Sequence, residues 1–213
     1  IQHAGVKYIT EAIVGALLLD PSRKFTWAEQ AYFVRWWEEQ KPSVKQLVKG
    51  LVARGQLLFV DGGWSQHDEG CLHFSTMIDQ SAFGNRFLVN ALNVVPSIGW
   101  HLDVFGHTGT QAALLSAEAG FDALYFARID YQDRDTRRRD GKMEMIWRGS
   151  PSLGKSADVF TGALAQGAYC APSQFSWVGE NLIPSKFDGE PLCTDPKIGG
   201  EGVGGGSCGD VAA

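Results

Sequence analysis

The sequence predicts an α/β fold in which a parallel β-sheet is covered by helices. Runs with strand-like character alternate with runs whose apolar residues recur at helical spacing, which is typical of this fold class. Proline and glycine punctuate the alternation at Pro21, Pro42, Gly55 and Gly120. The chain has 213 residues, of which 44% are hydrophobic and 20% charged. This is enough for one substantial core or for part of a larger domain.

The first half of the chain predicts four helices and two strands. Helices are expected over residues 2–19, 32–40, 44–54 and 68–92, and strands over residues 25–31 and 57–60. Asp68 and Glu69 suit the N-terminus of the last of these helices because its dipole favours acidic residues. Glu29 stands in an apolar strand, where an unpaired carboxylate is costly. We therefore expect Glu29 to have a structural partner or to lie near a polar site.

The second half repeats the alternation around an apolar strand that ends at Asp103. Val94, Val95, Ile98 and Trp100 lead into this strand end. A helix over residues 111–119 follows, then a strand over 121–127 and shorter strands over 143–147 and 159–161. The basic run over residues 134–142 also contains two aspartates and is expected to be a solvated loop.

Asp103 is the first candidate for a functional residue. Parallel sheets place their chemistry beyond the carboxyl ends of their strands, where Asp103 would lie. Gly106 permits a sharp turn that would bring Phe105 and His107 to the same place. Arg128 follows the strand over 121–127 and could hold a carboxylate ionised. Alternatively, Asp103 could simply cap the next helix.

Composition and motifs exclude several classes of function. The net charge of −5 and pI near 5.5 give no broad basic field, so we expect no nucleic-acid partner. No nucleotide-phosphate loop occurs, and no stretch approaches the ~20 apolar residues of a membrane span. The cysteines lack the spacing of a zinc ribbon, and Cys71 is expected to be a small buried hydrophobe. His67 and His73 are expected to be loop or surface histidines. Trp64 could stack on a sugar or cover the core.

The segment Trp-His-Leu-Asp-Val-Phe-Gly-His, residues 100–107, resembles a known family motif. It is similar to the nucleophile segment W-x-x-D-P-F-G-H of the class II α-mannosidases, glycoside hydrolase family 38. Further matching stretches follow in the family's order. They include residues 25–29, 62–64, 126–133, 145–148 and 158–162. The matches run from about residue 2 to 175 and are most similar to the lysosomal, or acid, α-mannosidase branch.

This resemblance implies a retaining, zinc-dependent exo-α-mannosidase that acts on mannose-containing glycans in the lysosome or vacuole. The implied fold is a parallel β/α barrel of seven strands, incomplete at both ends here. By motif position, Asp103 matches the nucleophile, which is also a zinc ligand in the family. Phe105, Arg128 and Tyr169 match residues that contact mannose. A retaining glycosidase also needs a second carboxylate, about 5–5.5 Å from the nucleophile, to protonate the leaving oxygen.

The chain also departs from the family pattern. The H-x-D motif that supplies two zinc ligands would precede Gln2, and the acid/base Asp and the last His ligand would follow in sequence absent here. Val104 replaces the usual proline. We therefore expect residues 1–198 to be a partial catalytic domain that works with the rest of a parent α-mannosidase chain. Residues 199–213 are expected to form a glycine-rich disordered tail.

Two alternatives to a mannosidase segment follow. The chain could be a catalytically inactive truncated fragment that binds carbohydrate. It could also be a zinc-dependent polysaccharide deacetylase, although that class needs an early Asp-Asp pair and an H-x₃-H motif, and neither occurs.

Overall fold

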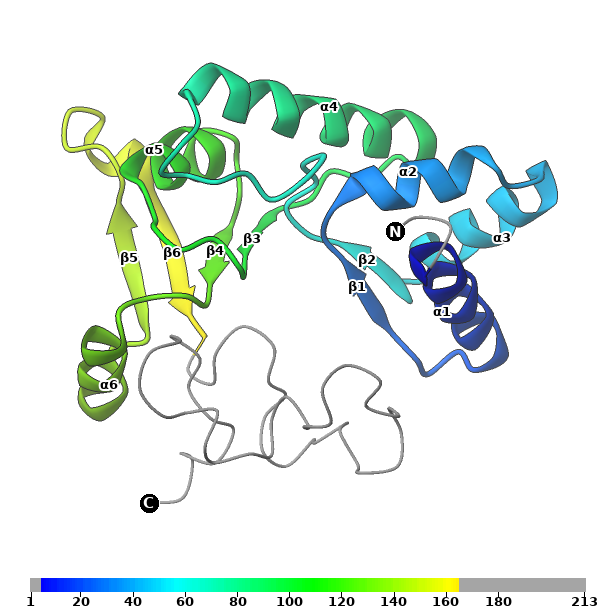
Figure 1. Ribbon diagram of the computed structural model, residues 1–213, viewed down its shortest axis with the longest axis horizontal. Coiled ribbons are helices and arrows are strands. Elements are labelled where there is room, and N and C mark those ends of the chain that lie inside the picture. Colours follow the sequence, from blue (N-terminus) through cyan, green and yellow to red (C-terminus); the bar gives the residue numbers. More distant parts are fainter. Residues whose placement is uncertain (1–4, 165–213) are drawn as a thin grey trace.

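The computed structural model describes residues 5–164, which form a mixed α/β structure (Figure 1). In chain order, its elements are α1 (Lys7–Leu19), β1 (Phe25–Trp27), α2 (Gln30–Glu38), α3 (Pro42–Ala53), β2 (Leu57–Phe59), α4 (Phe74–Leu92), β3 (Ile98–His101), α5 (Gly109–Ala112), the π-helical turn η2 (Ala113–Ala117), β4 (Ala123–Phe126), α6 (Tyr131–Asp140), β5 (Glu144–Arg148), the 3₁₀ turn η3 (Gly154–Ala157) and β6 (Asp158–Ala163). The predicted alternation of helices and strands is therefore present, although β1, β2 and β4 are shorter than expected and β6 is longer.

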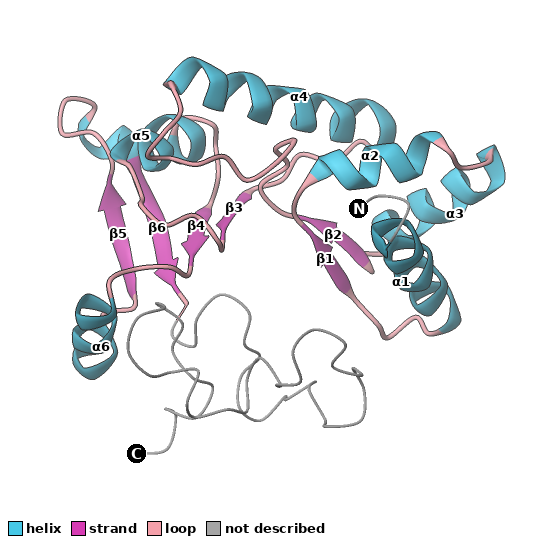
Figure 2. Ribbon diagram, in the orientation of Figure 1, coloured by secondary structure: helices cyan, strands magenta, loops and turns pink. Residues whose placement is uncertain are grey.

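The described strands form two sheets (Figure 2). Strands β1 and β2 pair in parallel, and β3, β4 and β6 form a second parallel set in the order β3-β4-β6. Strand β5 is antiparallel to β6, which differs from the expected all-parallel sheet. Only residues 149–157 separate these two strands, and a parallel pair needs a crossover of about a dozen residues or more. A seven-stranded barrel is not seen among the described residues.

Helix α4 and a backbone contact connect the two sheets. The Asp61 N–H donates to the Ile98 carbonyl at 2.6 Å, which joins the end of β2 to the start of β3. Helix α4 runs along the top of Figure 1, over both sheets. Its Gly84 packs directly on the loop after β2, since a Cβ there would lie 2.2 Å from the Gly62 carbonyl oxygen. The Trp64 N–H also donates to the Gln80 carbonyl of α4 at 3.1 Å.

A large apolar cluster, here called the aromatic core, lies between helices α1–α4 and strands β1 and β2. Phe33 is at its centre and contacts the rings of five other aromatic residues. These five are Trp27, Trp36, Trp37, Phe59 and Phe87. The apolar cluster beside the second sheet is much smaller and consists of Ala112, Leu124 and Val159, with Ala117 and Trp147 packed against it. Most of the clustered apolar packing therefore lies beside the first sheet, and most of it comes from helices α1–α4.

Helix α4 begins six residues later than expected. The His73 side chain, rather than Asp68 or Glu69, caps it by accepting from the Ser75 N–H at 3.3 Å. Cys71 was expected to be buried, which is wrong. It lies before the start of α4, and its side chain is exposed. His73 is exposed, as predicted.

The basic run over residues 134–142 lies mostly in helix α6, so the expected loop was wrong there. The Asp130 side chain accepts from the Gln132 and Asp133 N–H groups and thereby caps the helix. Asp133 pairs with Arg137 one turn later, and Gly141 ends the helix in the left-handed conformation. These local interactions stabilise a helix that has almost no apolar face.

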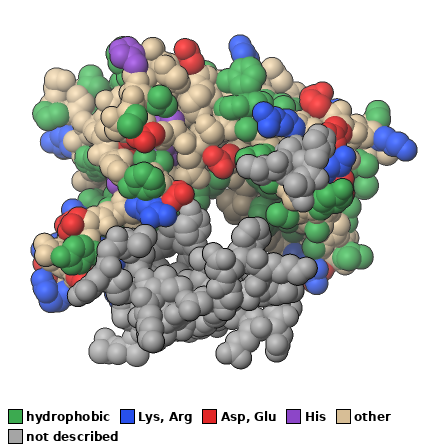
Figure 3. All heavy atoms as spheres, viewed as in Figure 1, with side chains coloured by type: hydrophobic (Ala, Val, Ile, Leu, Met, Phe, Trp, Pro, Cys, Tyr) green, Lys and Arg blue, Asp and Glu red, His purple; other side chains and the backbone are tan. Residues whose placement is uncertain are grey.

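Charge and hydropathy at the surface agree with the composition. Over the face shown in Figure 3, basic and acidic side chains are interspersed, and the basic ones form no continuous patch. None of the helices within residues 5–164 has the length and apolar character needed to cross a membrane.

Candidate active site

Polar side chains follow the carboxyl ends of four parallel strands. Glu29 comes after β1, Gln66 after β2, Asp103 after β3 and Arg128 after β4. Glu29 has the structural partner expected for it, because its Oε1 accepts from the Gln66 N–H at 3.0 Å. The Gln66 Oε1 in turn accepts from the Leu102 N–H at 3.0 Å. These two contacts bring the carboxyl ends of β1, β2 and β3 together at one edge of the structure.

Asp103 and Arg128, both predicted site residues, are directly paired. The Arg128 Nε donates to Asp103 Oδ1 at 2.5 Å, and the Arg128 guanidinium lies 5.4 Å from the centre of the Phe105 ring. The Asp103 side chain is 52% exposed, so it is accessible to a substrate. It does not cap α5, because the Thr108 hydroxyl accepts from the Gln111 N–H at 3.2 Å and caps that helix. Tyr169, the fourth predicted site residue, lies outside the described residues.

Two neighbouring cavities meet at Phe105. The smaller has a volume of about 390 Å³ and is lined by Asp103, Phe105, Glu29 and Asp68, among others. The larger, of about 840 Å³, extends beyond Phe105 and Arg128 along helix α6.

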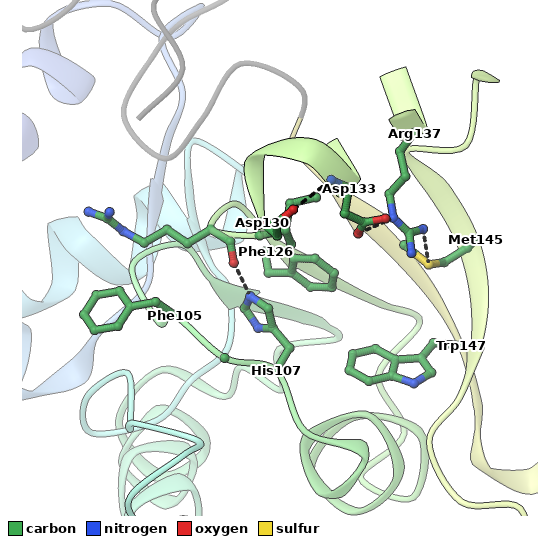
Figure 4. Close-up of a pocket in the computed structure, with 11 residues that line it drawn as sticks. Phe105, His107, Phe126, Asp130, Asp133, Arg137, Met145 and Trp147 are labelled. Carbon is green, nitrogen blue, oxygen red and sulfur yellow. Dashed lines mark hydrogen bonds and ion pairs between the residues drawn. The ribbon is translucent and has the colours of Figure 1, made fainter. Parts of the chain in front are cut away.

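Aromatic and charged side chains both line the larger cavity, in which the His107 ring stacks on Phe126 with centroids 4.1 Å apart (Figure 4). Its acidic residues already have partners, because Asp130 caps α6 and Asp133 pairs with Arg137. Of the two cavities, the smaller one therefore contains the accessible predicted nucleophile. The larger offers an adjoining apolar surface.

A group of mostly buried ionisable side chains includes residues on both sides of Asp103 in the sequence, and we call Asp61, Glu69, His101 and His107 the Glu69 cluster. The His101 Nδ1 is 3.0 Å from Glu69 Oε1, and the His101 Nε2 is 3.4 Å from Asp61 Oδ1. Glu69 Oε1 also lies 3.5 Å from the His107 Nδ1. The His101 side chain is completely buried, and Asp61 and Glu69 are nearly so. The cluster therefore places ion pairs in the interior of the structure.

Electrostatics keep Glu69 and His101 charged despite their burial. Desolvation favours the neutral form of His101, but the contacts and charges of Asp61 and Glu69 outweigh it and raise the pKa of His101 to about 9. Desolvation likewise opposes ionisation of Glu69, but its contacts with His101, His107 and the Thr108 N–H lower its pKa to about 2. Buried charges persist in proteins only when they are paired in this way.

His67 lies beside this cluster and is buried, contrary to the expectation of a loop or surface histidine. Its Nδ1 accepts from the Gln80 Nε2 at 2.6 Å, and its Nε2 donates to Gln111 Oε1 at 2.8 Å. This pattern requires the neutral imidazole. Burial and the adjacent positive charge of His101 both lower the pKa of His67. His67 therefore links helices α4 and α5 without adding a charge.

Sequence reasoning missed Asp61, Glu69 and His101. A sequence signal exists for His101, which stands within an apolar strand two residues before Asp103. An ionisable side chain there requires a buried partner. The position of His101 does not identify that partner, because Glu69 is 32 residues away in the sequence. Glu69 was also predicted to lie at the N-terminus of a helix.

The described residues do not form a zinc site. Among residues 5–164, no three His, Cys, Asp or Glu side chains are arranged to hold a metal ion. Asp103 faces the Arg128 cation, and the nearby histidines His101 and His107 lie against Glu69. A catalytic zinc normally needs three protein ligands, so we derive no step through a metal from these residues.

Comparisons with known proteins agree with the sequence motifs. The family model described as the glycosyl hydrolases family 38 N-terminal domain matches residues 2–198. The chain is 51% identical to a probable α-mannosidase of Arabidopsis thaliana over 163 residues, covering 76% of this chain and 16% of that protein. It is 46% identical to the α-mannosidase of Canavalia ensiformis over 88% of this chain and 19% of that protein. It is 43% identical to human lysosomal α-mannosidase over 92% of this chain and 19% of that protein.

A solved structure supports the fold. The crystal structure of an α-mannosidase from Enterococcus faecalis superimposes with a TM-score of 0.59 at 18% identity, covering 76% of this chain and 18% of that chain. The chain thus spans less than a fifth of the length of these relatives. The match of the family model over most of the sequence shows that the chain belongs to the glycoside hydrolase family 38 N-terminal domain family.

Proposed function

We propose that this chain contributes the nucleophile of a retaining α-mannosidase that hydrolyses terminal α-mannose from glycans. The observation that carries the proposal is the Asp103–Arg128 pair beside Phe105, at the carboxyl end of β3 and within the family's nucleophile motif. The relatives named α-mannosidases support the substrate class. Since the chain spans less than a fifth of their length, we propose that it acts within a longer polypeptide.

The proposed reaction uses Asp103 as a covalent nucleophile. Its carboxylate attacks the anomeric carbon of mannose while the bond to the leaving oxygen breaks, and a second carboxylic acid protonates that oxygen. Water then hydrolyses the glycosyl ester and regenerates Asp103. Arg128 orients the carboxylate through its Nε contact. The Phe105 ring, which is 75% exposed between the two cavities, offers an apolar surface to the sugar.

The proposal extends to zinc and to cellular location. Zinc dependence follows from the family resemblance, with Asp103 as one ligand and the other ligands outside the described residues. A lysosomal or vacuolar location is supported by the lysosomal relatives.

The test is hydrolysis of an aryl α-mannoside by the natural full-length protein and its Asp103→Ala variant. We expect the variant to lose about 10³-fold or more in kcat, because a covalent nucleophile is removed. Its stability should stay within about 0.5 kcal/mol of the parent, since the side chain is half exposed. The exposed Asp122→Ala variant is the matched control.

Two outcomes would contradict the proposal. If Asp103→Ala retained substantial activity per folded molecule, the nucleophile assignment would be wrong. If the full-length protein bound mannosides without hydrolysing them, the non-catalytic carbohydrate-binding alternative would replace the enzyme. Removing metal with a chelator and restoring it with zinc tests the metal requirement in the same assay.

A further inference from the structure

We infer that Glu69 is a positioning residue, which fixes the Asp103 segment and Arg128 by way of His101 and His107. The inference rests on the proposed function, because it concerns the placement of the proposed nucleophile. It assigns a role to a buried carboxylate that lines neither cavity and is 34 residues from Asp103 in the sequence.

The Glu69 carboxylate contacts both ends of a short segment, residues 101–108, which contains Asp103. Glu69 Oε1 lies 3.0 Å from the His101 Nδ1, before Asp103, and 3.5 Å from the His107 Nδ1, after it. Glu69 Oε2 accepts from the Thr108 N–H at 2.7 Å. Glu69 is therefore ion-paired with His101 at one end of segment 101–108 and accepts a hydrogen bond from Thr108 at the other.

Most of the side chains in the middle of this segment are exposed, and Val104 is the buried exception. Phe105 and Gly106 are exposed, and Asp103 is half exposed. Gly106 has a φ of +141°, a conformation that L side chains rarely adopt. Val104 and the contact of the Leu102 N–H with Gln66 also fix this middle part, so the Glu69 contacts at the two ends act together with them on the position of Asp103.

The Glu69 cluster also contacts Arg128 through His107. The His107 Nε2 donates to the Arg128 carbonyl oxygen at 2.8 Å, a contact shown by the dashed line beside His107 in Figure 4. The guanidinium of the same arginine donates to Asp103. A continuous series of contacts thus runs from Glu69 through His107 to the backbone of Arg128, and from its side chain to Asp103. Partners of this kind, behind the groups that touch substrate, hold them within the narrow geometric limits that catalysis needs.

Variants of Glu69 and His107 in the natural full-length protein separate positioning from simple structural support. Glu69→Gln keeps the size of the side chain but removes its charge. We expect kcat to fall ~10- to 100-fold while KM changes less than about threefold. The matched control is Glu118→Gln, at an exposed site outside the cluster. If Glu69 only supports the fold, kcat per folded molecule stays at the parent value while the melting temperature falls, and that result would overturn the inference.

Two substitutions at His107 provide a rescue test. His107→Gln retains an N–H that can reach the Arg128 carbonyl, whereas His107→Phe retains only the stacking on Phe126. We expect kcat of His107→Gln to exceed that of His107→Phe by about 10-fold. Equal kcat values for the two variants would show that the contact with Arg128 does not matter and would contradict the inference.

NMR signals of Arg128 and Thr108 test the positioning role of Glu69 without an activity assay. The Arg128 Nε–H signal reports its contact with Asp103, and the Thr108 amide reports its contact with Glu69. In Glu69→Gln, we expect the Arg128 signal to shift and the Thr108 amide to exchange faster, with both unchanged in Glu118→Gln. Unchanged signals in Glu69→Gln would contradict the inference. If the parent protein hydrolyses no α-mannoside, the proposed function fails, and these signals still decide whether Glu69 positions the segment.

Discussion

Around β1 and β2, eleven buried apolar side chains pack into the aromatic core, whereas the buried apolar cluster beside β3, β4 and β6 contains only Ala112, Leu124 and Val159. The second region instead buries the ionisable groups of the Glu69 cluster. Apolar burial is non-directional and contributes to stability in proportion to area. A buried ion pair fixes geometry and adds little stability over apolar packing of the same volume, although removing the charge of one partner is costly. We therefore expect the first region to determine stability and the second to determine where Asp103 lies.

The largest expected change in stability is in the aromatic core. Trp36→Ala should lower the free energy of unfolding by about 3–5 kcal/mol, because the side chain is 1% exposed and a large cavity would remain. Leu19→Ala, at an exposed position, is the control with little effect. Urea unfolding measures both. The comparison fails if Trp36→Ala leaves stability unchanged but lowers activity per folded molecule.

The next largest effect is a loss of stability in acid that arises in the Glu69 cluster. The pKa of Glu69 falls from 4.5 to about 2 on folding, so its ionisation stabilises the fold above pH 4.5. This contribution, on the order of 3 kcal/mol, is lost as the pH falls from 4.5 towards 2. The stability difference between the parent and Glu69→Gln should therefore shrink across this range in urea titrations. A difference independent of pH would show that the Glu69 charge does not stabilise the fold.

A smaller effect is expected where helix α4 joins the two regions. Gly84→Ala should lower the free energy of unfolding by about 1–3 kcal/mol, because its Cβ would overlap backbone atoms of Gly62 and Gly63. Gly15→Ala in α1 is the matched control, since no atom lies within 4 Å of its added Cβ. That substitution should stabilise the protein by roughly 0.5–1 kcal/mol. Thermal unfolding measures the stability of both variants. If Gly84→Ala and Gly15→Ala changed stability equally, α4 would not pack closely on the loop after β2.

Local sequence patterns predicted most of the elements and placed Asp103, Phe105 and Arg128 just beyond strand ends, where the structure has them. Their roles in a site stay a prediction. Apolar runs and the breakers between them locate the strands, and Asp103 and Arg128 follow strands whose carboxyl ends meet at one edge. Helix α6 was missed because its residues are nearly all polar. The sequence nevertheless contains two indications of this helix, an N-cap aspartate at Asp130 and a terminating glycine at Gly141.

The remaining differences depend on contacts between distant residues. The pairing of Glu69 with His101 joins residues 32 positions apart, and a loop after β2 brings them together. Nothing in the local spacing of either residue indicates this pairing. Strand β5 is antiparallel to β6 because the connection between them is short. The length of that connection follows from the sequence once the bounds of the two strands are known.

The most direct test of the account is to trap the glycosyl-enzyme intermediate. The natural full-length protein is incubated with an activated fluorinated α-mannoside whose covalent intermediate hydrolyses slowly, then digested and analysed by mass spectrometry. Our account predicts a single mannosyl label on the peptide that contains Asp103 and no label in the Asp103→Ala variant. A label on Glu29 or Asp68, which line the same cavity, or on any other carboxylate would contradict it.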